Sequence, residues 1–325
     1  MLVYAGIDEA GYGPMFGPLV VARSVLICDR VGCDDDWPPL WRVLKAVVCR
    51  KVADKKKRIA VNDSKALYTP AAGLAHLERG VLAFAHAAGL EPANVDRLLH
   101  GVGYDPASRQ PDQLWYAAED GGPALPVAID HGRLAISRAQ LRRALGRSAI
   151  RVAPPSAAVI FEDRFNHMVH ATRSKARCSW TFVAGHLQAI WEQFGTHQPR
   201  VVIDRQGGRT RYLELLGLLF DGADIRVLSE TPLLSEYHIA RADRSMRVVC
   251  QIDSEQHHMP VALASMTAKY LREVLMMRFN AFWQTHKADL KPTAGYYGDG
   301  KRFLDDIQPL IDQLAIDRQS LVRTR

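Results

Sequence analysis

Apolar and polar positions divide the start of the chain into two buried strands joined by a glycine-rich loop. The first apolar run begins at Leu2 and ends in Asp8 and Glu9, and a second run covers 19–27. Five Gly and Pro residues lie between the runs, as is typical of a hairpin connection. Carboxylates at the end of a buried strand are costly unless a cation meets them. The alternative is an ordinary hairpin with two solvated acids beside its turn.

The rest of the pattern alternates between helical and strand spacing. Helices are expected over 40–52, 74–89, 137–145, 180–194, 211–220 and 260–283, with a helical pattern also resuming at 157 and a last amphipathic helix within 301–325. Strands are expected over 199–204, 225–228 and 246–252. This order predicts an α/β fold whose sheet mixes an antiparallel start with parallel crossovers.

The segment 91–156 differs in composition from the rest of the chain. It contains seven prolines and the turn-like Gly121-Gly122, but also Trp115, Tyr116 and apolar runs that give it something to bury. We therefore interpret it as an inserted subdomain within a main domain formed by 1–90 and 157–290. The segment 291–325 is expected to be a C-terminal helical segment.

Composition narrows the class of protein without identifying its partner. Apolar residues make up 48% of the 325 residues, and 42 Lys and Arg against 35 Asp and Glu give a net charge of +7, which suits a polyanionic partner. The basic run 51–58 could bind phosphates or form a solvated face. Five scattered cysteines without a C-x-x-C pair indicate reduced thiols and argue against a zinc site. With no leader and no apolar stretch of membrane-spanning length, we expect a cytoplasmic monomer without membrane contact.

Acids follow three separate predicted strands: Asp8 with Glu9, then Asp204, then Asp253. In an open sheet ligands bind where strand ends meet loops, so these acids can converge. Neighbouring side chains on a strand point to opposite faces, so Asp8 and Glu9 can share an ion only at a strand end, at a bulge, or through the backbone carbonyl of Glu9. Hard oxygen ligands select Mg²⁺ or Mn²⁺, and a pair of such ions can activate water for phosphodiester cleavage. The alternative is that each acid merely caps a turn.

Five motifs follow one another along the chain: Gly6-Ile-Asp-Glu-Ala-Gly-Tyr-Gly-Pro14 with Gly17-Pro18, Asn62-Asp-Ser-Lys65, Val202-Ile-Asp204, Asp253-Ser254 followed by Ala264-Ser-Met-Thr-Ala-Lys269 and Arg272, and Gly295-Tyr296. Their order resembles the type II ribonuclease H (ribonuclease HII) family over most of the chain outside 91–156. The resemblance implies a ribonuclease H-like fold, a mixed sheet with flanking helices, with 1–90 and 157–290 as the catalytic domain. It also implies Mg²⁺- or Mn²⁺-dependent cleavage of RNA in RNA–DNA hybrids, or of ribonucleotides embedded in duplex DNA. The products would carry 3′-hydroxyl and 5′-phosphate ends, and the role would lie in DNA replication and repair.

Carried over position by position, the resemblance assigns the catalytic and metal-binding acids to Asp8, Glu9, Asp204 and Asp253. It places Gly11 and Gly13, with Tyr12 between them, where the family's loop meets the ribose 2′-hydroxyl. Tyr296 matches a tyrosine that stacks on the sugar of the following deoxynucleotide. The positions that resemble phosphate-binding ones are Ser64, Lys65, Lys269 and Arg272.

Several departures keep other functions open. Tyr12 stands where the family has arginine, and two extra residues after Asp253 bring in His257 and His258, which we interpret as loop residues rather than metal ligands. An aspartate as the fourth acid and the absence of a preceding domain disfavour type III relatives. The alternatives are a catalytically inactive nucleic-acid-binding module and a two-metal nuclease of this fold with a structured substrate.

Overall fold

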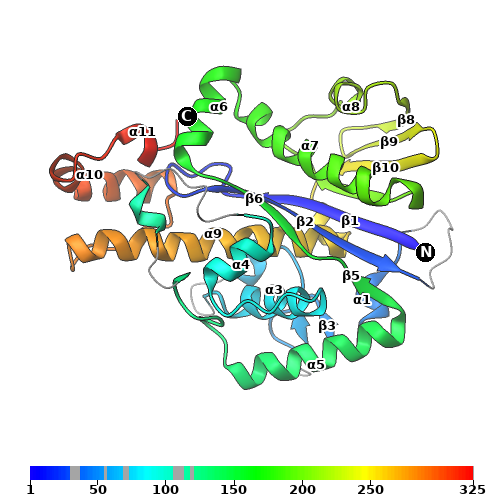
Figure 1. Cartoon of the computed structure of the whole chain (residues 1–325), viewed down its shortest axis with the longest axis horizontal. Helices are drawn as coiled ribbons and strands as arrows, with labels where there is room; N and C mark the ends of the chain where they lie inside the picture. The colour runs from blue at the N-terminus through cyan, green and yellow to red at the C-terminus, as the bar shows by residue number, and fades with distance from the viewer. Residues whose placement is uncertain (30–36, 55–56, 69–72, 105–112, 118–120, 325) are drawn as a thin grey trace.

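One mixed β-sheet runs through the protein, with helices on both of its faces (Figure 1). The computed structural model describes residues 1–29, 37–54, 57–68, 73–104, 113–117 and 121–324. In that part, the sheet order is β5 (Ile150–Val152), β2 (Leu19–Cys28), β1 (Leu2–Ala10), β7 (Arg200–Asp204), β10 (Arg244–Gln251), β9 (Leu234–Arg241) and β8 (Asp224–Glu230), and β6 (Ser156–Ile160) pairs with β2. The predicted α/β class, a mixed sheet with flanking helices, is confirmed.

The register of β1 places its two acids at the point where the strand leaves its parallel neighbour. β1 pairs with β2 in antiparallel fashion as far as Ala10, as the hairpin prediction requires. On its other side β1 pairs in parallel with β7, and that ladder ends at Ile7 opposite Ile203. Asp8 and Glu9 therefore lie just beyond the last β1–β7 pair.

Two hydrophobic cores fill the space on either side of the sheet. One core packs α3 (Ala75–Ala87), α5 (His131–Ser148) and α9 (Met259–His286) against residues such as Tyr4, and the other packs α6 (Glu162–Thr172), α7 (Lys175–Phe194) and α8 (Leu213–Leu219) against Ile7. Because side chains alternate along a strand, Asp8 points to the α9 side and Glu9 to the α7 side.

Shorter elements complete the described part of the chain. They are the helices α1 (Leu40–Val43), α2 (Ser64–Leu67), α4 (Val95–Gly101), α10 (Tyr297–Gln313) and α11 (Arg318–Leu321), the pair β3 (Val48–Cys49) with β4 (Ile59–Ala60), and the 3₁₀ turns η2 (Leu114–Tyr116), η4 (Gly195–His197) and η5 (Ser254–Gln256). No described helix has the length and apolar character needed to cross a membrane.

Three sequence predictions differ from the structure. The helix expected over 40–52 ends at Val43, because Val48 and Cys49 pair with β4 instead. The pattern from 157 begins with the strand β6 rather than a helix, and β9 was not predicted at all. Two lysines of the basic run, Lys55 and Lys56, lie outside the described residues.

The segment 91–156 is built onto the main sheet. Its strand β5 pairs with β2, and its helix α5 packs against α3 with Leu134 and Leu141 in the common core. The division of the chain into 1–90 with 157–290, 91–156 and 291–325 stays a prediction.

Candidate active site

A pocket of about 280 Å³ opens at the carboxyl ends of β1 and β7. Four of its lining acids lie on the strand ends and the 3₁₀ turn: Asp8 and Glu9 on β1, Asp204 on β7, and Glu255 on η5. The other lining residues come from the glycine loop, α2 and α9, and include Gly11, Tyr12, Gly13, Asp63, Ser64, Lys65, Ser265, Lys269 and Tyr296.

Twelve residues were predicted for this site from the sequence. Ten of them line the pocket, whereas Asp253 and Arg272 do not.

Asp8 and Glu9 reach the pocket from opposite faces of the sheet. The Asp8 side chain is buried; its Oδ1 accepts a hydrogen bond from the Glu9 backbone N–H (2.7 Å), and Ser265 of α9 also bonds to the carboxylate. Glu9 Oε2 accepts from Gln206 Nε2 (3.0 Å), which also donates to Ser179 Oγ of α7 (2.6 Å). The end of the β1–β7 ladder is thus what lets two neighbouring strand residues line one pocket.

The acid that lies beside Asp204 in the pocket is Glu255. The sequence had indicated Asp253, two residues earlier in the chain. Asp204 Oδ1 accepts from the backbone N–H (3.2 Å) and the hydroxyl (3.0 Å) of Ser254, and the Glu255 carboxyl bonds to that of Asp204. Glu255 is buried, and its Oε2 has no hydrogen-bond partner. Asp253 is exposed, with φ of 51°. Its assignment as a metal ligand stays a prediction.

Burial and mutual repulsion raise the pKa of the carboxyl groups of Asp8, Glu9, Asp204 and Glu255. Burial is the largest cause for all four, and the neighbouring Asp204 and Glu9 raise the pKa of Asp8 further, to well above its ordinary range. The pKa of Glu9 rises to about 7, although Gln206 and Lys65 oppose the shift. The pKa of Glu255 also rises to about 7, with Asp204 contributing, and that of Asp204 is raised. Ionising this set is costly unless a cation is bound.

The donor set fits a hard divalent cation. Among the described residues, no three His, Cys, Asp or Glu side chains form a ready-made metal cage. Mg²⁺ is ordinarily held by one or two carboxylates, with waters and substrate phosphates completing its shell, so such a cage is not required. The unpartnered Oε2 of Glu255 and the crowded carboxylates suit Mg²⁺ or Mn²⁺.

The fold requires glycine at position 11 of the loop but not at position 13. Gly11 has φ of +86°, and a Cβ there would lie 2.5 Å from the Pro18 carbonyl oxygen, so the fold itself needs glycine. A Cβ on Gly13 would meet no atom within 4 Å. Nothing in the described protein therefore requires Gly13, and the open space beside it can admit a ligand.

The C-terminal tail holds this loop from behind. The Arg323 guanidinium donates to the carbonyl oxygens of Gly11 and Tyr12 and lies 3.8 Å from the centroid of the Phe165 ring. The Arg323 backbone N–H donates to the Met15 carbonyl (2.9 Å). Tyr12 thus lies on a loop that an arginine from the C-terminal tail supports.

The predicted phosphate-binding residues fall into two groups. Ser64, Lys65 and Lys269 line the pocket; Lys65 is exposed, while Lys269 Nζ pairs with Glu273 (2.6 Å). The Arg272 side chain is fully buried and donates to the carbonyl oxygens of Phe16 and Ala294, each at 3.0 Å. Here Arg272 supports the loops, and a phosphate contact by it stays a prediction.

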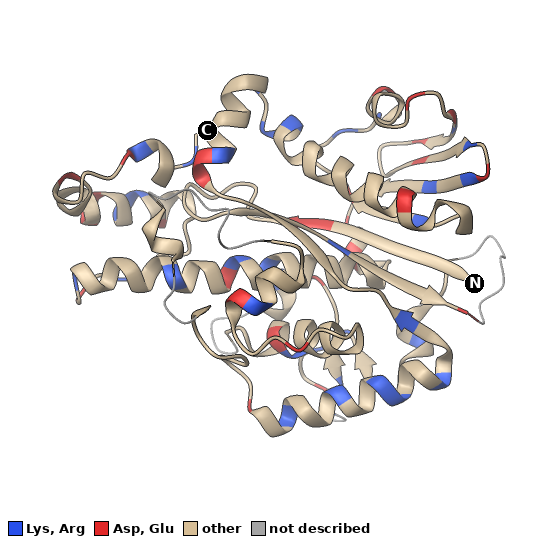
Figure 2. Ribbon diagram, viewed as in Figure 1, with Lys and Arg blue, Asp and Glu red and all other residues tan. Residues whose placement is uncertain are grey.

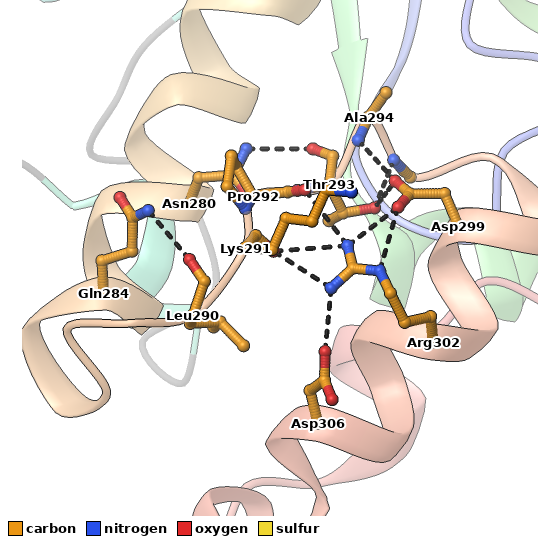
Figure 3. A network of polar contacts seen from close by, with 11 residues as sticks. Asn280, Gln284, Leu290, Lys291, Pro292, Thr293, Ala294, Asp299, Arg302 and Asp306 are labelled. Carbon is orange, nitrogen blue, oxygen red and sulfur yellow. Dashed lines mark hydrogen bonds and ion pairs between the residues drawn. The ribbon is translucent and has the colours of Figure 1, made fainter.

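Tyr296 is half exposed at the pocket rim and is not a core aromatic. Figure 3 shows the polar network that fixes the preceding segment, in which Arg302 contacts Asp299 and the Lys291 and Pro292 carbonyls. Asp299 in turn accepts from the Thr293 hydroxyl (2.5 Å). The Gly295 carbonyl accepts from the Met15 N–H (2.9 Å), which ties this segment to the glycine loop.

The histidines after Asp253 lie outside the pocket lining. His258 is buried between the Tyr4 hydroxyl (2.5 Å) and Gln251 Oε1 (2.9 Å), so its ring nitrogens are occupied by the core. His257 is exposed. Sequence reasoning missed Gln206, Ser265 and Glu255. Two of these carried a signal: Ser265 lies within the Ala264–Lys269 motif, and Glu255 is an acid inside the two-residue expansion after Asp253.

The chain is similar in structure to ribonucleases H of types II and III. One is ribonuclease HII of Archaeoglobus fulgidus in a complex with PCNA (TM-score 0.43, 15% identity, covering 100% of this chain and 95% of that one). Others are ribonuclease H2 of Pyrococcus horikoshii OT3 (0.45, 14%, 98% and 92%) and Bst-RNase HIII with Mn²⁺ (0.44, 14%, 99% and 66%). No family model and no curated protein sequence matches the chain. Because these similarities are distant, only the chain's own residues can support a function for it.

Proposed function

We propose that this protein is a type II ribonuclease H that uses Mg²⁺ or Mn²⁺ to cleave RNA in RNA–DNA hybrids, or ribonucleotides embedded in duplex DNA. The observation that carries the proposal is the pocket itself, where four acids from three segments meet two lysines and a glycine loop. A protein without phosphodiester chemistry has no evident use for two buried acids, Asp8 and Glu255, and two half-buried ones, Glu9 and Asp204, crowded into one pocket. We also propose that it works as a cytoplasmic monomer in DNA replication and repair.

Each part of the pocket has a role in this reaction. Asp8, Asp204 and Glu255, with Glu9 beside them, would hold the divalent cations, which supply water activation and stabilisation of the leaving oxygen. Asp253 is the other acid that the motif offers for the fourth position. Lys65 and Lys269 provide positive charge for the phosphates that flank the scissile bond.

The remaining lining residues would distinguish RNA from DNA. The open backbone at Gly13 leaves room for a ribose, whose 2′-hydroxyl the loop can meet. The exposed Tyr296 ring can stack on the next sugar of the same strand. Cleavage would then leave a 3′-hydroxyl and a 5′-phosphate.

A cleavage assay on four labelled duplexes tests the proposal. These are an RNA–DNA hybrid, a DNA duplex with a single ribonucleotide, an all-DNA duplex and an all-RNA duplex, each with Mg²⁺, Mn²⁺ or a chelator. We expect cleavage of the first two only, dependent on metal and abolished in Asp8→Asn. Including Tyr12→Arg shows whether the missing arginine shifts the preference between a hybrid and a single ribonucleotide.

Two outcomes would favour other functions. Tight duplex binding without cleavage under any metal condition would indicate an inactive nucleic-acid-binding module. Equal cutting of all-DNA and hybrid duplexes would indicate a nuclease that recognises substrate structure rather than the ribose.

A further inference from the structure

Helix α5, far from the active-site acids in sequence, carries five arginines and no acidic residue. Arg133, Arg142, Arg143 and Arg147 are exposed, whereas Leu134, Leu141 and Leu145 pack into the core. Figure 2 shows the result as blue segments along the lower helix of the view. Within the described part of the chain, no ion pair joins any of these arginines to a carboxylate.

A hollow of about 610 Å³ lies beside the start of this helix and adds to its positive charge. Lys57, Arg79 and Arg133 line it, together with Asp130, whose Oδ1 caps α5 by accepting from the Arg133 N–H (2.8 Å). The buried Arg79 side chain donates hydrogen bonds to neutral groups, namely Ser137 Oγ (2.8 Å) and the carbonyl oxygens of Arg58 (2.9 Å) and Lys57 (2.6 Å). Burial, and then the nearby Arg133, lower the pKa of Arg79. An anion in the hollow would relieve this repulsion.

The basic face lies within reach of a duplex held at the active site. Lys57 at the hollow and Ser64 at the pocket are seven residues apart, so their Cα atoms are separated by at most about 25 Å. One turn of duplex DNA spans roughly 34 Å. Along α5, the fourteen residues from Arg133 to Arg147 rise about 21 Å. A duplex longer than one turn can therefore meet both regions.

We propose that the arginine face of α5, with the adjacent hollow, is a second contact surface for the phosphate backbone of the substrate duplex. The inference rests on the proposed function, because it takes the nucleic acid as given and adds where the duplex continues. Contacts of this kind position a duplex without reading its sequence, and they weaken as salt rises. The surface thus selects long duplexes over short ones.

The test removes three charges from one side of the helix. The triple variant changes Arg133, Arg143 and Arg147 to Gln. Successive members of this set are ten and four residues apart, which places all three on one side of α5. The control variant, Arg211→Gln with Arg226→Gln and Arg241→Gln, removes the same charge around α8, β8 and β9, which lie at the top of Figure 1 while α5 lies at the bottom. Hybrids of roughly 10 and roughly 30 base pairs, about one and three turns, serve as probes. Affinities are measured without divalent metal, so that nothing is cut.

We expect the α5 variant to bind the long hybrid more weakly, with the slope of log affinity against log salt reduced by roughly 3, about one per lost phosphate contact. The ratio of the wild-type affinity to the variant's affinity for the long hybrid should then shrink roughly 40-fold between about 50 and 200 mM salt. The control variant should keep most of the wild-type slope, and the short hybrid should be bound and cut alike by all three proteins. Unchanged thermal unfolding of the α5 variant confirms that it folds.

An unchanged slope in the α5 variant, or an equal loss in the control variant, would overturn this surface while leaving the proposed function intact. Failure of the wild type to cut the short hybrid in Mg²⁺ or Mn²⁺ would count against the proposed function separately. If the wild type binds neither hybrid, both proposals fall.

Discussion

Replacing Glu255 with Gln asks which acid completes the carboxylate set. Glu255 lines the pocket and bonds to Asp204, whereas Asp253 is exposed and outside the lining. Glu255→Gln keeps the shape of the side chain but removes its charge. Asp253→Asn makes the matching change at the position that the motif indicated.

The pKa of Glu255 sets the expected change in stability. Its pKa rises from 4.5 to about 7 on folding, so above pH 7 the folded protein carries an ionised group that burial and Asp204 disfavour. A shift of this size corresponds to about 3 kcal/mol. The penalty is fully present above about pH 7 and fades as the pH falls toward 4.5. In a chelator, Glu255→Gln should therefore be more stable than the wild type by up to about 3 kcal/mol near pH 8, and by only about 1 kcal/mol near pH 5.

Activity should change in the opposite direction to stability. Without the charge at Glu255, cleavage of a hybrid in Mg²⁺ should fall on the order of 100-fold, the size of effect seen when one preorganised electrostatic group is removed. Denaturant unfolding at the two pH values and single-turnover cleavage measure the two effects. Asp253→Asn should change both far less. Full activity in Glu255→Gln together with loss of activity in Asp253→Asn would refute the assignment of Glu255.

Three further predictions concern the loop, the core and the tail. Gly13→Ala should leave thermal unfolding unchanged but lower hybrid cleavage roughly 10-fold, because a ligand and not the protein needs the space at this residue. Gly11→Ala should instead lower the free energy of unfolding by about 2–4 kcal/mol in denaturant. Equal behaviour of the two variants would contradict this separation of roles. Burial lowers the pKa of His186 to about 4, so the unfolded chain takes up a proton at this residue at a higher pH than the folded protein does. The free energy of unfolding of the wild type should therefore fall by up to about 3 kcal/mol between about pH 6.5 and pH 4. His186→Gln should flatten that part of the plot of unfolding free energy against pH. Arg323→Lys replaces the two guanidinium nitrogens that donate to the Gly11 and Tyr12 carbonyls by one ammonium nitrogen. It should raise KM for the hybrid, whereas Arg318→Lys on the exposed side of the tail should not.

The parts of the site that lie on strand ends could be predicted from the sequence. Asp8, Glu9 and Asp204 each follow an apolar run of strand type, and such runs place the next residue at the sheet edge whatever the surrounding loops do. Glu255 could not be placed in this way. The left-handed turn at Asp253 and the short η5 that follows decide which acid faces the pocket, and neither has a clear periodic signal.

Long-range supports of the site were also beyond the sequence. Arg323 lies 312 residues from Gly11, and Gln206 lies 197 residues from Glu9, so their contacts exist only once the chain has folded. The missed strands β6 and β9 have a related cause. A short apolar run fits a strand or a helix equally well, and pairing with β2 or β10 decides between them.

The central claim is that acids brought together from β1, β7 and η5 hold divalent metal. The most direct test is crystallography of the protein soaked in Mn²⁺, with anomalous scattering used to locate the ion. The account predicts an anomalous peak among Asp8, Asp204 and Glu255, which disappears in Asp204→Asn. A well-ordered pocket without a peak at saturating Mn²⁺, or a peak that survives in Asp204→Asn, would contradict it.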